Sequence, residues 1–261
     1  MLAWMTEVLR TGTVTTRYPR GPLPPTGAFR GFVRVLPGAS CGGSCRRCEE
    51  VCPVSAVYWT GPRGHLDHAR CLRCDRCREV CPEERISFAA SPLGAVCRRG
   101  ALRETVGTPA RSTESVRPHR ILARSLTVRT VDAGSCGACE AEIQALANPY
   151  YDCSRLGISF TPTPKHADLL LVTGPVTAGM LEPLRQAYLS LPAPRLMVAA
   201  GACAASGGPF PPSPLSHGAL DQVLPVDVYV PGCPPHPLAL LEALLLATGR
   251  GPKRLPGVAA R

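Results

Sequence analysis

The most informative stretch of this 261-residue sequence is Cys71-Leu72-Arg73-Cys74-Asp75-Arg76-Cys77-Arg78-Glu79-Val80-Cys81-Pro82. Its pattern, C-x2-C-x2-C-x3-C-P, is typical of chains that bind iron–sulfur clusters. Three closely spaced thiolates can bind three iron atoms of one cubane from a single tight loop. The fourth cysteine stands before a proline that redirects the chain, so its thiolate is expected to reach a second cluster. The stretch therefore predicts part of a two-cluster unit.

A related run lies upstream, at Cys41-Gly42-Gly43-Ser44-Cys45-Arg46-Arg47-Cys48-Glu49-Glu50-Val51-Cys52-Pro53. From Cys45 onward it repeats the downstream spacing, but its first interval is C-x3-C instead of C-x2-C. Gly42 and Gly43 can absorb the additional residue, because glycine reaches backbone angles that other residues avoid. If Cys41 is not a ligand, the alternative at that site is a three-iron centre. Zinc is disfavoured, because zinc ribbons space their cysteines as separated pairs and one tetrahedral ion cannot use eight thiolates.

With these two runs, residues 35–90 resemble a two-cluster bacterial ferredoxin. The resemblance implies an α+β ferredoxin-like domain with two [4Fe–4S] clusters. The ligands that it implies are Cys41, Cys45, Cys48 and Cys81 for one cluster and Cys71, Cys74, Cys77 and Cys52 for the other. Short strands are predicted at residues 57–59, 65–67 and 86–88. Residues 1–34 form a lead-in, and residues 91–125 are predicted to be a solvated basic linker because they lack an apolar period.

The second half of the chain alternates apolar runs with helical patterns, which is typical of a parallel α/β sheet. We therefore predict a flavodoxin-like α/β domain over residues 126–250 and a tail over 251–261. The predicted strands are residues 126–131, 168–173, 195–200 and 227–230. The predicted helices are residues 139–147, 177–189 and 236–248.

Four further cysteines follow three of these strands: Cys136 and Cys139 the first, Cys203 the third and Cys233 the fourth. In an open α/β sheet, ligands bind beyond the carboxyl ends of the strands, so these cysteines are expected to converge. Four thiolates at one point suit a single cubane cluster, and on ligand count alone zinc also remains possible. The remaining two cysteines, Cys97 and Cys153, are predicted to be ordinary thiols.

Three glycine-rich segments around these cysteines carry a second resemblance. They are Asp132-Ala133-Gly134-Ser135-Cys136-Gly137-Ala138-Cys139-Glu140-Ala141-Glu142, Gly201-Ala202-Cys203-Ala204 and Pro231-Gly232-Cys233-Pro234-Pro235. In this order they resemble the small subunit of energy-converting, membrane-bound group 4 [NiFe] hydrogenases. That family is homologous to the small Fe–S subunit of respiratory complex I, which carries its terminal cluster. The resemblance covers residues 120–250, and together with the N-terminal part the chain looks like a fusion of two neighbouring subunits.

The second resemblance implies a non-catalytic electron-transfer subunit with three [4Fe–4S] clusters. Electrons would pass from a donor protein through the two ferredoxin-like clusters to a proximal cluster on Cys136, Cys139, Cys203 and Cys233, and then to a catalytic large subunit. Membrane-arm subunits are the other implied partners. Glu140 and Glu142 are candidate modulators of the proximal cluster, although a helix N-terminus favours carboxylates in any case.

The alternative within the same family is a complex I-like subunit that delivers electrons to quinone. The complex I subunit has two adjacent cysteines at its first site, whereas two residues separate Cys136 from Cys139 here. This spacing favours the hydrogenase branch.

Charge and composition narrow the remaining classes of protein. The first 125 residues hold 20 arginines and no lysine against 10 acidic residues, which raises the question of nucleic acid. Iron–sulfur clusters bound by thiolates are anionic and can take up this positive charge, so no nucleic-acid partner is predicted. A zinc-bearing nucleic-acid module is the competing hypothesis.

The sequence also bears on location. It has no apolar run of 18 residues and no signal-peptide layout, so we expect a cytoplasmic chain, peripheral on the inner face of the cytoplasmic membrane. Leu2, Met5, Val8 and Leu9 share one face of a predicted helix, which either docks on protein or lies on the membrane surface.

Overall fold

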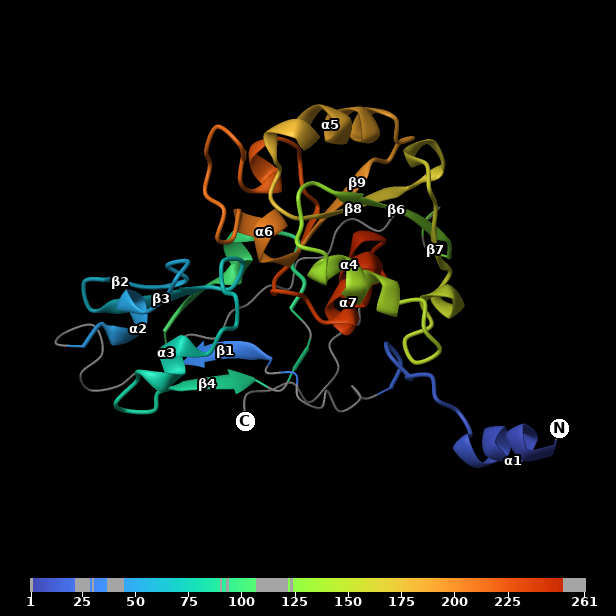
Figure 1. Cartoon of the computed structure of the whole chain (residues 1–261), viewed down its shortest axis with the longest axis horizontal. Coiled ribbons are helices and arrows are strands. Elements are labelled where there is room, and N and C mark those ends of the chain that lie inside the picture. Colours follow the sequence, from blue (N-terminus) through green and yellow to red (C-terminus); the bar gives the residue numbers. More distant parts are fainter. Residues whose placement is uncertain are drawn as a thin grey trace.

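The computed structural model describes residues 2–21, 29, 31–36, 45–89, 91–92, 94–106, 122 and 124–250. A larger part with a five-stranded sheet packs against a smaller part with two small sheets (Figure 1). The N-terminal helix α1 (Leu2–Thr11) projects from the body, and its Leu9 is 81% exposed. Within the described ranges, no helix has the length and apolar character needed to cross a membrane.

The sheet of the larger part is parallel and has the strand order β10–β9–β8–β6–β7. Its strands are β6 (Leu126–Asp132), β7 (Ile158–Phe160), β8 (Leu169–Thr173), β9 (Leu196–Ala200) and β10 (Val228–Val230). Counted within this part, the order is 2-1-3-4-5, which is the flavodoxin-like arrangement. The predicted fold of the second half is therefore confirmed, and β7 is a strand that the sequence did not predict.

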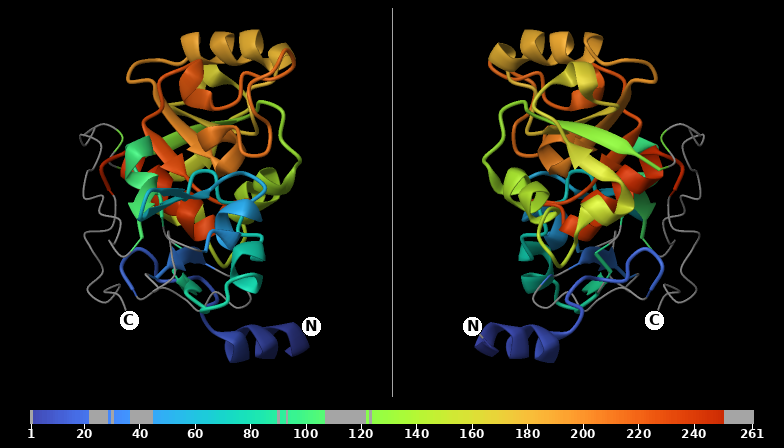
Figure 2. Two further views of the ribbon diagram at one scale, coloured as in Figure 1. Left: turned by 90° about the vertical axis from the view of Figure 1, so that its left-hand side faces the viewer. Right: turned by 90° about the vertical axis from the view of Figure 1, so that its right-hand side faces the viewer.

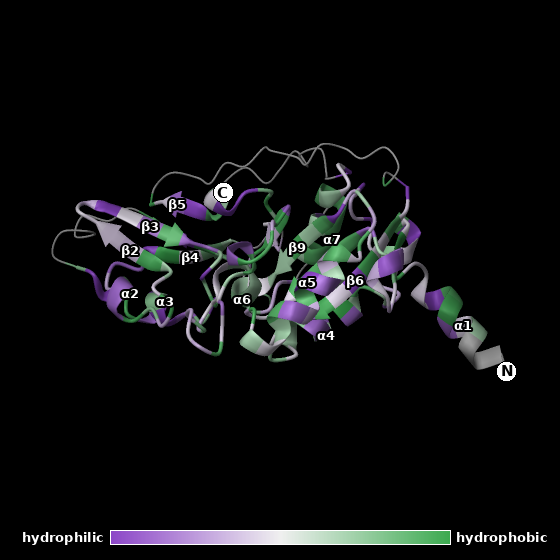
Figure 3. Cartoon of the chain, turned by 90° about the horizontal axis from the view of Figure 1, so that it is seen from above, coloured by the Kyte–Doolittle hydropathy of each residue, from purple (hydrophilic) through white to green (hydrophobic). Residues whose placement is uncertain are grey.

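Helices cover both faces of this sheet (Figure 2). On one face lie α4 (Ala138–Ala145) and α7 (Pro237–Ala247), whose Ile143 and Leu241 pack with Val128 of β6. On the other face lie α5 (Leu181–Leu189) and α6 (Gly201–Ser206), which pack against β8 and β9. Single-turn helices complete the part: η3 (Cys153–Leu156), η4 (Pro164–His166), η5 (Ala178–Met180) and η6 (Leu220–Gln222). The leucine–alanine helix α7 is almost wholly buried and is among the most apolar elements (Figure 3).

The smaller part consists of two antiparallel sheets and two short helices. Strand β1 (Phe32–Val35) pairs with β4 (Ile86–Ala89), and β3 (Arg63–Asp67) lies between β2 (Val57–Thr60) and β5 (Arg103–Thr105). The helices are α2 (Arg47–Glu50) and α3 (Arg76–Glu79), which contact each other. Strands β2, β3 and β4 lie where the sequence predicts strands, whereas β1 and β5 were not predicted.

Residues 94–106 differ from the solvated linker that the sequence predicts. Val96 forms a β-bridge with Tyr229 of β10, and β5 adds a third strand to the small sheet. Between them, Arg99 of η1 (Arg99–Leu102) forms hydrogen bonds of 2.9 and 2.7 Å with the two carboxylate oxygens of Asp67. Such isolated apolar and charged residues have no periodicity, so their burial is evident only from tertiary contacts. Residues 107–121 and 123 of the predicted linker lie outside the described chain.

Candidate metal centres

Cys136 and Cys139 lie directly beyond the carboxyl end of β6. Asp132 ends this strand, and its Oδ1 accepts hydrogen bonds from the backbone N–H groups of Gly134 at 2.8 Å and Ser135 at 2.6 Å. These bonds fix the loop that carries Cys136. Cys139 then lies in the first turn of α4.

Cys203 and Cys233 reach the same edge of the sheet from β9 and β10. Gly201, with φ +90°, connects β9 to α6, so Cys203 lies in the first turn of that short helix. The carbonyl of Gly232 accepts a hydrogen bond from the N–H of Ala202 at 2.7 Å. This bond holds the Cys203 and Cys233 segments side by side.

The structure brings together the four cysteines that we call the proximal cysteines: Cys136, Cys139, Cys203 and Cys233. Burial raises the pKa of Cys139 to about 12, and the charges of Glu140 and of the other three sulfurs add to this effect. Burial is the main cause that raises the pKa of Cys203 to about 11, and the charges of Cys233 and Cys136 add to this effect. These thiols therefore hold their protons at neutral pH until a metal displaces them.

The surroundings of the proximal cysteines fit an iron–sulfur cluster. A Cβ atom at position 201 would lie only 2.7 Å from Sγ of Cys139, so glycine leaves the backbone in contact with the sulfur. Among the residues that the structure describes, no group of three or more Cys, His, Asp or Glu side chains is arranged so that it could hold a single metal ion. Four thiols spread over three loops suit a cubane, in which each thiolate binds a different iron atom.

The two candidate carboxylates have different surroundings. Glu140 affects the pKa of Cys139, and its Oε1 accepts a hydrogen bond from the hydroxyl of Thr173. Its buried Oε2 has no partner among the described residues. Glu142 is half-buried, which raises its pKa. Its charge contributes to the raised pKa of the Tyr151 hydroxyl. The structure therefore places Glu140 beside the proximal cysteines.

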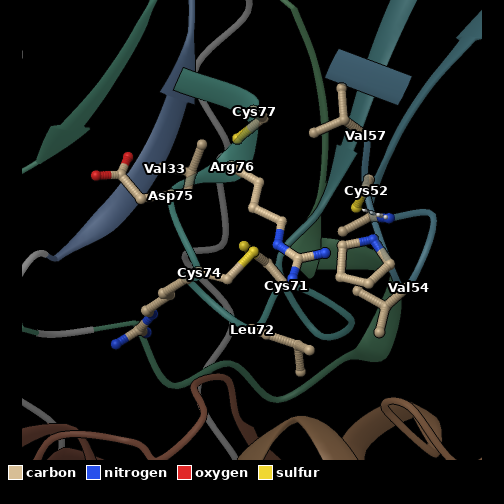
Figure 4. Close-up of a pocket in the computed structure, with 13 residues that line it drawn as sticks. Val33, Cys52, Val54, Val57, Cys71, Leu72, Cys74, Asp75, Arg76 and Cys77 are labelled. Atoms are coloured by element: carbon tan, nitrogen blue, oxygen red, sulfur yellow. Dashed lines mark hydrogen bonds between the residues drawn. The ribbon is translucent and has the colours of Figure 1, made fainter. Parts of the chain in front are cut away.

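A second set, which we call the medial cysteines, consists of Cys52, Cys71, Cys74 and Cys77. Together they line a small cavity whose wall includes Val33 and Val57 (Figure 4). Burial is the main cause that raises the pKa of Cys71 to about 11 and of Cys77 to about 12, and the neighbouring sulfurs contribute. Cys52 of the upstream run thus joins three cysteines of the downstream run, which is the grouping that the sequence predicts.

The third set, the distal cysteines, consists of Cys41, Cys45, Cys48 and Cys81, of which Cys41 lies outside the described residues. Cys48 of α2 and Cys81 after α3 pack against the same small apolar core. The same type of hydrogen bond occurs in each of the two cysteine runs. In both, the backbone N–H group four residues after the last cysteine donates to the sulfur of that cysteine. These bonds are Ala56 N to Cys52 Sγ at 3.1 Å and Arg85 N to Cys81 Sγ at 3.3 Å.

Arg73 lies between the medial and the proximal cysteines. The sequence did not identify this residue. Its Nη2 donates to the carbonyl oxygen of Pro231 at 3.0 Å. Burial lowers the pKa of Arg73 to about 10, while the nearby sulfurs of Cys71 and Cys233 act in the opposite direction. The guanidinium therefore stays cationic at neutral pH. Of the two remaining cysteines, Cys153 lies buried in the core of the larger part, and Cys97 packs at its edge.

Comparisons with known proteins match the region that holds the proximal cysteines. The family model described as NADH ubiquinone oxidoreductase, 20 kDa subunit, matches residues 136–247. The probable membrane-bound hydrogenase subunit mbhJ of Pyrococcus furiosus is 44% identical over 138 residues, which cover 53% of this chain and 83% of that protein. This chain belongs to the family of the 20 kDa subunit of NADH ubiquinone oxidoreductase. Family members carry an iron–sulfur cluster, in agreement with the donor set described above.

The chain is also similar to a further curated protein and to a chain of a solved structure. Formate hydrogenlyase subunit 7 of Escherichia coli is 46% identical over 126 residues, or 48% of this chain. The match spans about half of that relative, 49% of its length. A solved chain of an archaeal membrane-bound sulfane sulfur reductase is 32% identical over 49% of this chain and 73% of its own length, with a TM-score of 0.43.

Proposed function

We propose that this chain is an electron-transfer subunit of a membrane-associated [NiFe] hydrogenase or formate hydrogenlyase-type complex. It would relay electrons through three [4Fe–4S] clusters to or from a catalytic large subunit. The observation that carries the proposal is the convergence of Cys136, Cys139, Cys203 and Cys233 from three loops at one edge of the sheet. The names of the hydrogenase relatives support the assignment to this type of complex.

In this proposal, the proximal cysteines hold the cluster nearest to the large subunit. The medial and distal cysteines hold one cluster each in a ferredoxin-like domain over residues 35–90. Bound clusters of this kind each accept and release one electron without a proton. The repeated N–H···S contacts to Cys52 and Cys81 support the two-cluster assignment, because hydrogen bonds to ligand sulfurs tune the reduction potential.

In this proposal, a side chain of this chain bridges the medial and proximal centres. Arg73 contacts the Pro231 carbonyl and acts on sulfurs of both the medial and the proximal set. This contact supports an order in which electrons pass between the distal, medial and proximal sets in turn. A donor or acceptor protein would then meet the distal end, and the large subunit the proximal end.

We infer that the chain is peripheral on the inner face of the cytoplasmic membrane and held there by membrane-arm subunits. The Pyrococcus furiosus relative is a probable membrane-bound hydrogenase subunit, which supports this location. Glu140, beside Cys139, is the better placed of the two carboxylates to modulate the proximal cluster.

The nickel content of the complex tests the hydrogenase assignment. We would purify the complex anaerobically from its native host with this chain as the handle, and measure nickel and iron. About one nickel per complex is expected for a hydrogenase. Abundant iron without nickel would contradict the assignment and favour the quinone-reducing alternative, to which the family description also belongs.

A further inference from the structure

Arg73 lies two residues after Cys71 and directly before Cys74 in the medial loop, yet its side chain is held by the other part of the molecule. Its Nη2 donates to the Pro231 carbonyl, which precedes Cys233 by two residues. Its guanidinium carbon lies 4.3 Å from the ring centroid of Phe32 and 5.1 Å from that of Phe29. Cations at these distances are attracted to aromatic rings. The guanidinium is therefore fixed at the junction of the medial and proximal cysteines.

A second donor nitrogen of this guanidinium faces no protein acceptor in the described chain. Nη1 of Arg73 is buried and has no hydrogen-bond partner among the described residues. A buried charged donor without an acceptor is costly unless a negative charge lies near it. The charge of Arg73 acts on the Cys71 sulfur on one side and on the Cys233 sulfur on the other. The two sulfurs on which this cation acts thus belong to two different sets, and each becomes a thiolate when a cluster is bound.

We propose that Arg73 is a positioning residue shared by the medial and proximal clusters, whose fixed positive charge raises the reduction potentials of both. The inference rests on the proposed function, because it requires clusters at both sets of cysteines. Reduction adds one negative charge to a cluster, and a nearby cation stabilises that added charge. Arginine suits this role, since its planar guanidinium keeps its charge and stacks on aromatic rings.

The shared charge has a consequence for the transfer step. One electron leaves one centre and the same electron enters the other, while no bond forms or breaks and no proton moves. A cation on one side only would raise one potential alone and change the difference between them. A cation that acts on both sides raises both, so the difference changes less.

The test compares three variants of the full chain, each purified anaerobically and checked for iron and sulfide content. R73Q removes the shared charge, and R73K keeps a charge but loses the guanidinium fork. R76Q is the matched control, because the exposed Arg76 of α3 also lines the medial cavity. Reduction potentials of the individual clusters are measured by redox titration followed by electron paramagnetic resonance.

We expect R73Q to lower the reduction equilibrium constants of the medial and proximal clusters about tenfold, which is about 59 mV for a one-electron couple. R76Q should affect the medial cluster alone, and R73K should leave both potentials near their native values. A change in the medial potential alone in R73Q, or in neither, would overturn the inference. A tenfold decrease in R73K would also overturn it, because the charge is then not the cause.

If R73Q fails to assemble its clusters, the reduction potentials of R73K test the inference. Native potentials in R73K with full iron content support the role of the charge, and lowered potentials contradict it. A native chain that lacks medial and proximal clusters would overturn the proposed function and this inference together. Intact clusters with unchanged potentials in R73Q would overturn this inference alone.

Discussion

Replacing Glu242 with glutamine should stabilise the folded chain above neutral pH. Glu242 lies on α7, and its Oε2 accepts hydrogen bonds from the backbone N–H groups of Gly94 at 2.8 Å and Ala95 at 2.9 Å. Burial raises its pKa from 4.5 to about 7, although the two backbone donors act in the opposite direction. A glutamine amide oxygen can accept the same two bonds without titrating.

The sign and size of the effect follow from proton binding. Between pH 4.5 and about 7 the folded chain keeps the Glu242 proton while the unfolded chain releases it. The contribution of this proton to stability is complete below pH 4.5 and is lost as the pH rises through 7. At about 1.4 kcal/mol per pH unit, the loss is about 3 kcal/mol. The free energy of unfolding of E242Q should therefore exceed that of the native chain by about this amount at pH 8, and match it near pH 4.5.

The assay is urea unfolding of both chains under identical anaerobic conditions from pH 5 to 8. Both chains hold the same cysteines, so pH effects on those thiols cancel in the difference between them. E182Q is the control, because Glu182 on α5 is an exposed carboxylate away from the contact with Gly94 and Ala95. A difference between E242Q and the native chain that stays constant with pH, or a less stable E242Q at pH 8, would refute the reasoning.

Three further predictions concern a proximal cysteine, the glycine beside it and a buried ion pair. Cys139→Ala should remove about four iron atoms per chain while the medial and distal clusters stay reducible, and an unchanged iron content would refute the proximal assignment. Gly201→Ala, whose Cβ would lie 2.7 Å from Cys139 Sγ at φ +90°, should lower the iron content and the free energy of unfolding by about 1–3 kcal/mol. Its control is Gly179→Ala, where a Cβ meets nothing within 4 Å, and equal behaviour of the two variants would contradict the steric argument. Arg99→Met leaves Asp67 buried without its bidentate partner and should cost about 3–5 kcal/mol in urea unfolding. Arg10→Met, which breaks a pair with 80% and 59% exposed side chains, should cost less than about 1 kcal/mol, and similar losses in both would refute the burial argument.

The fold of the second half was accessible from the sequence because its central strands are continuous apolar runs. Strands β8 and β9 are buried at every position, and all of their side chains except Thr173 are apolar. Strand β7 escaped prediction because it has three residues, of which Ser159 and Phe160 are exposed at the sheet edge. Helix α6 escaped because its six small residues carry no helical period.

The cysteine sets were predictable for a different reason. The spacing within each run is local, and the loops beyond parallel strands must lie at one edge of the sheet. Arg73 had no such signal, because its contact with Pro231 joins residues 158 positions apart. The burial of Arg99 against Asp67 likewise depends on tertiary packing, so residues 94–106 had the composition of a linker.

The iron and acid-labile sulfide content of the full chain, purified anaerobically, tests the central claim most directly. Three [4Fe–4S] clusters predict about twelve iron atoms and about twelve sulfides per chain. Reduction should then give three sets of paramagnetic signals, one for each set of cysteines. Iron and sulfide for a single cluster, with one signal, would contradict the three-centre relay.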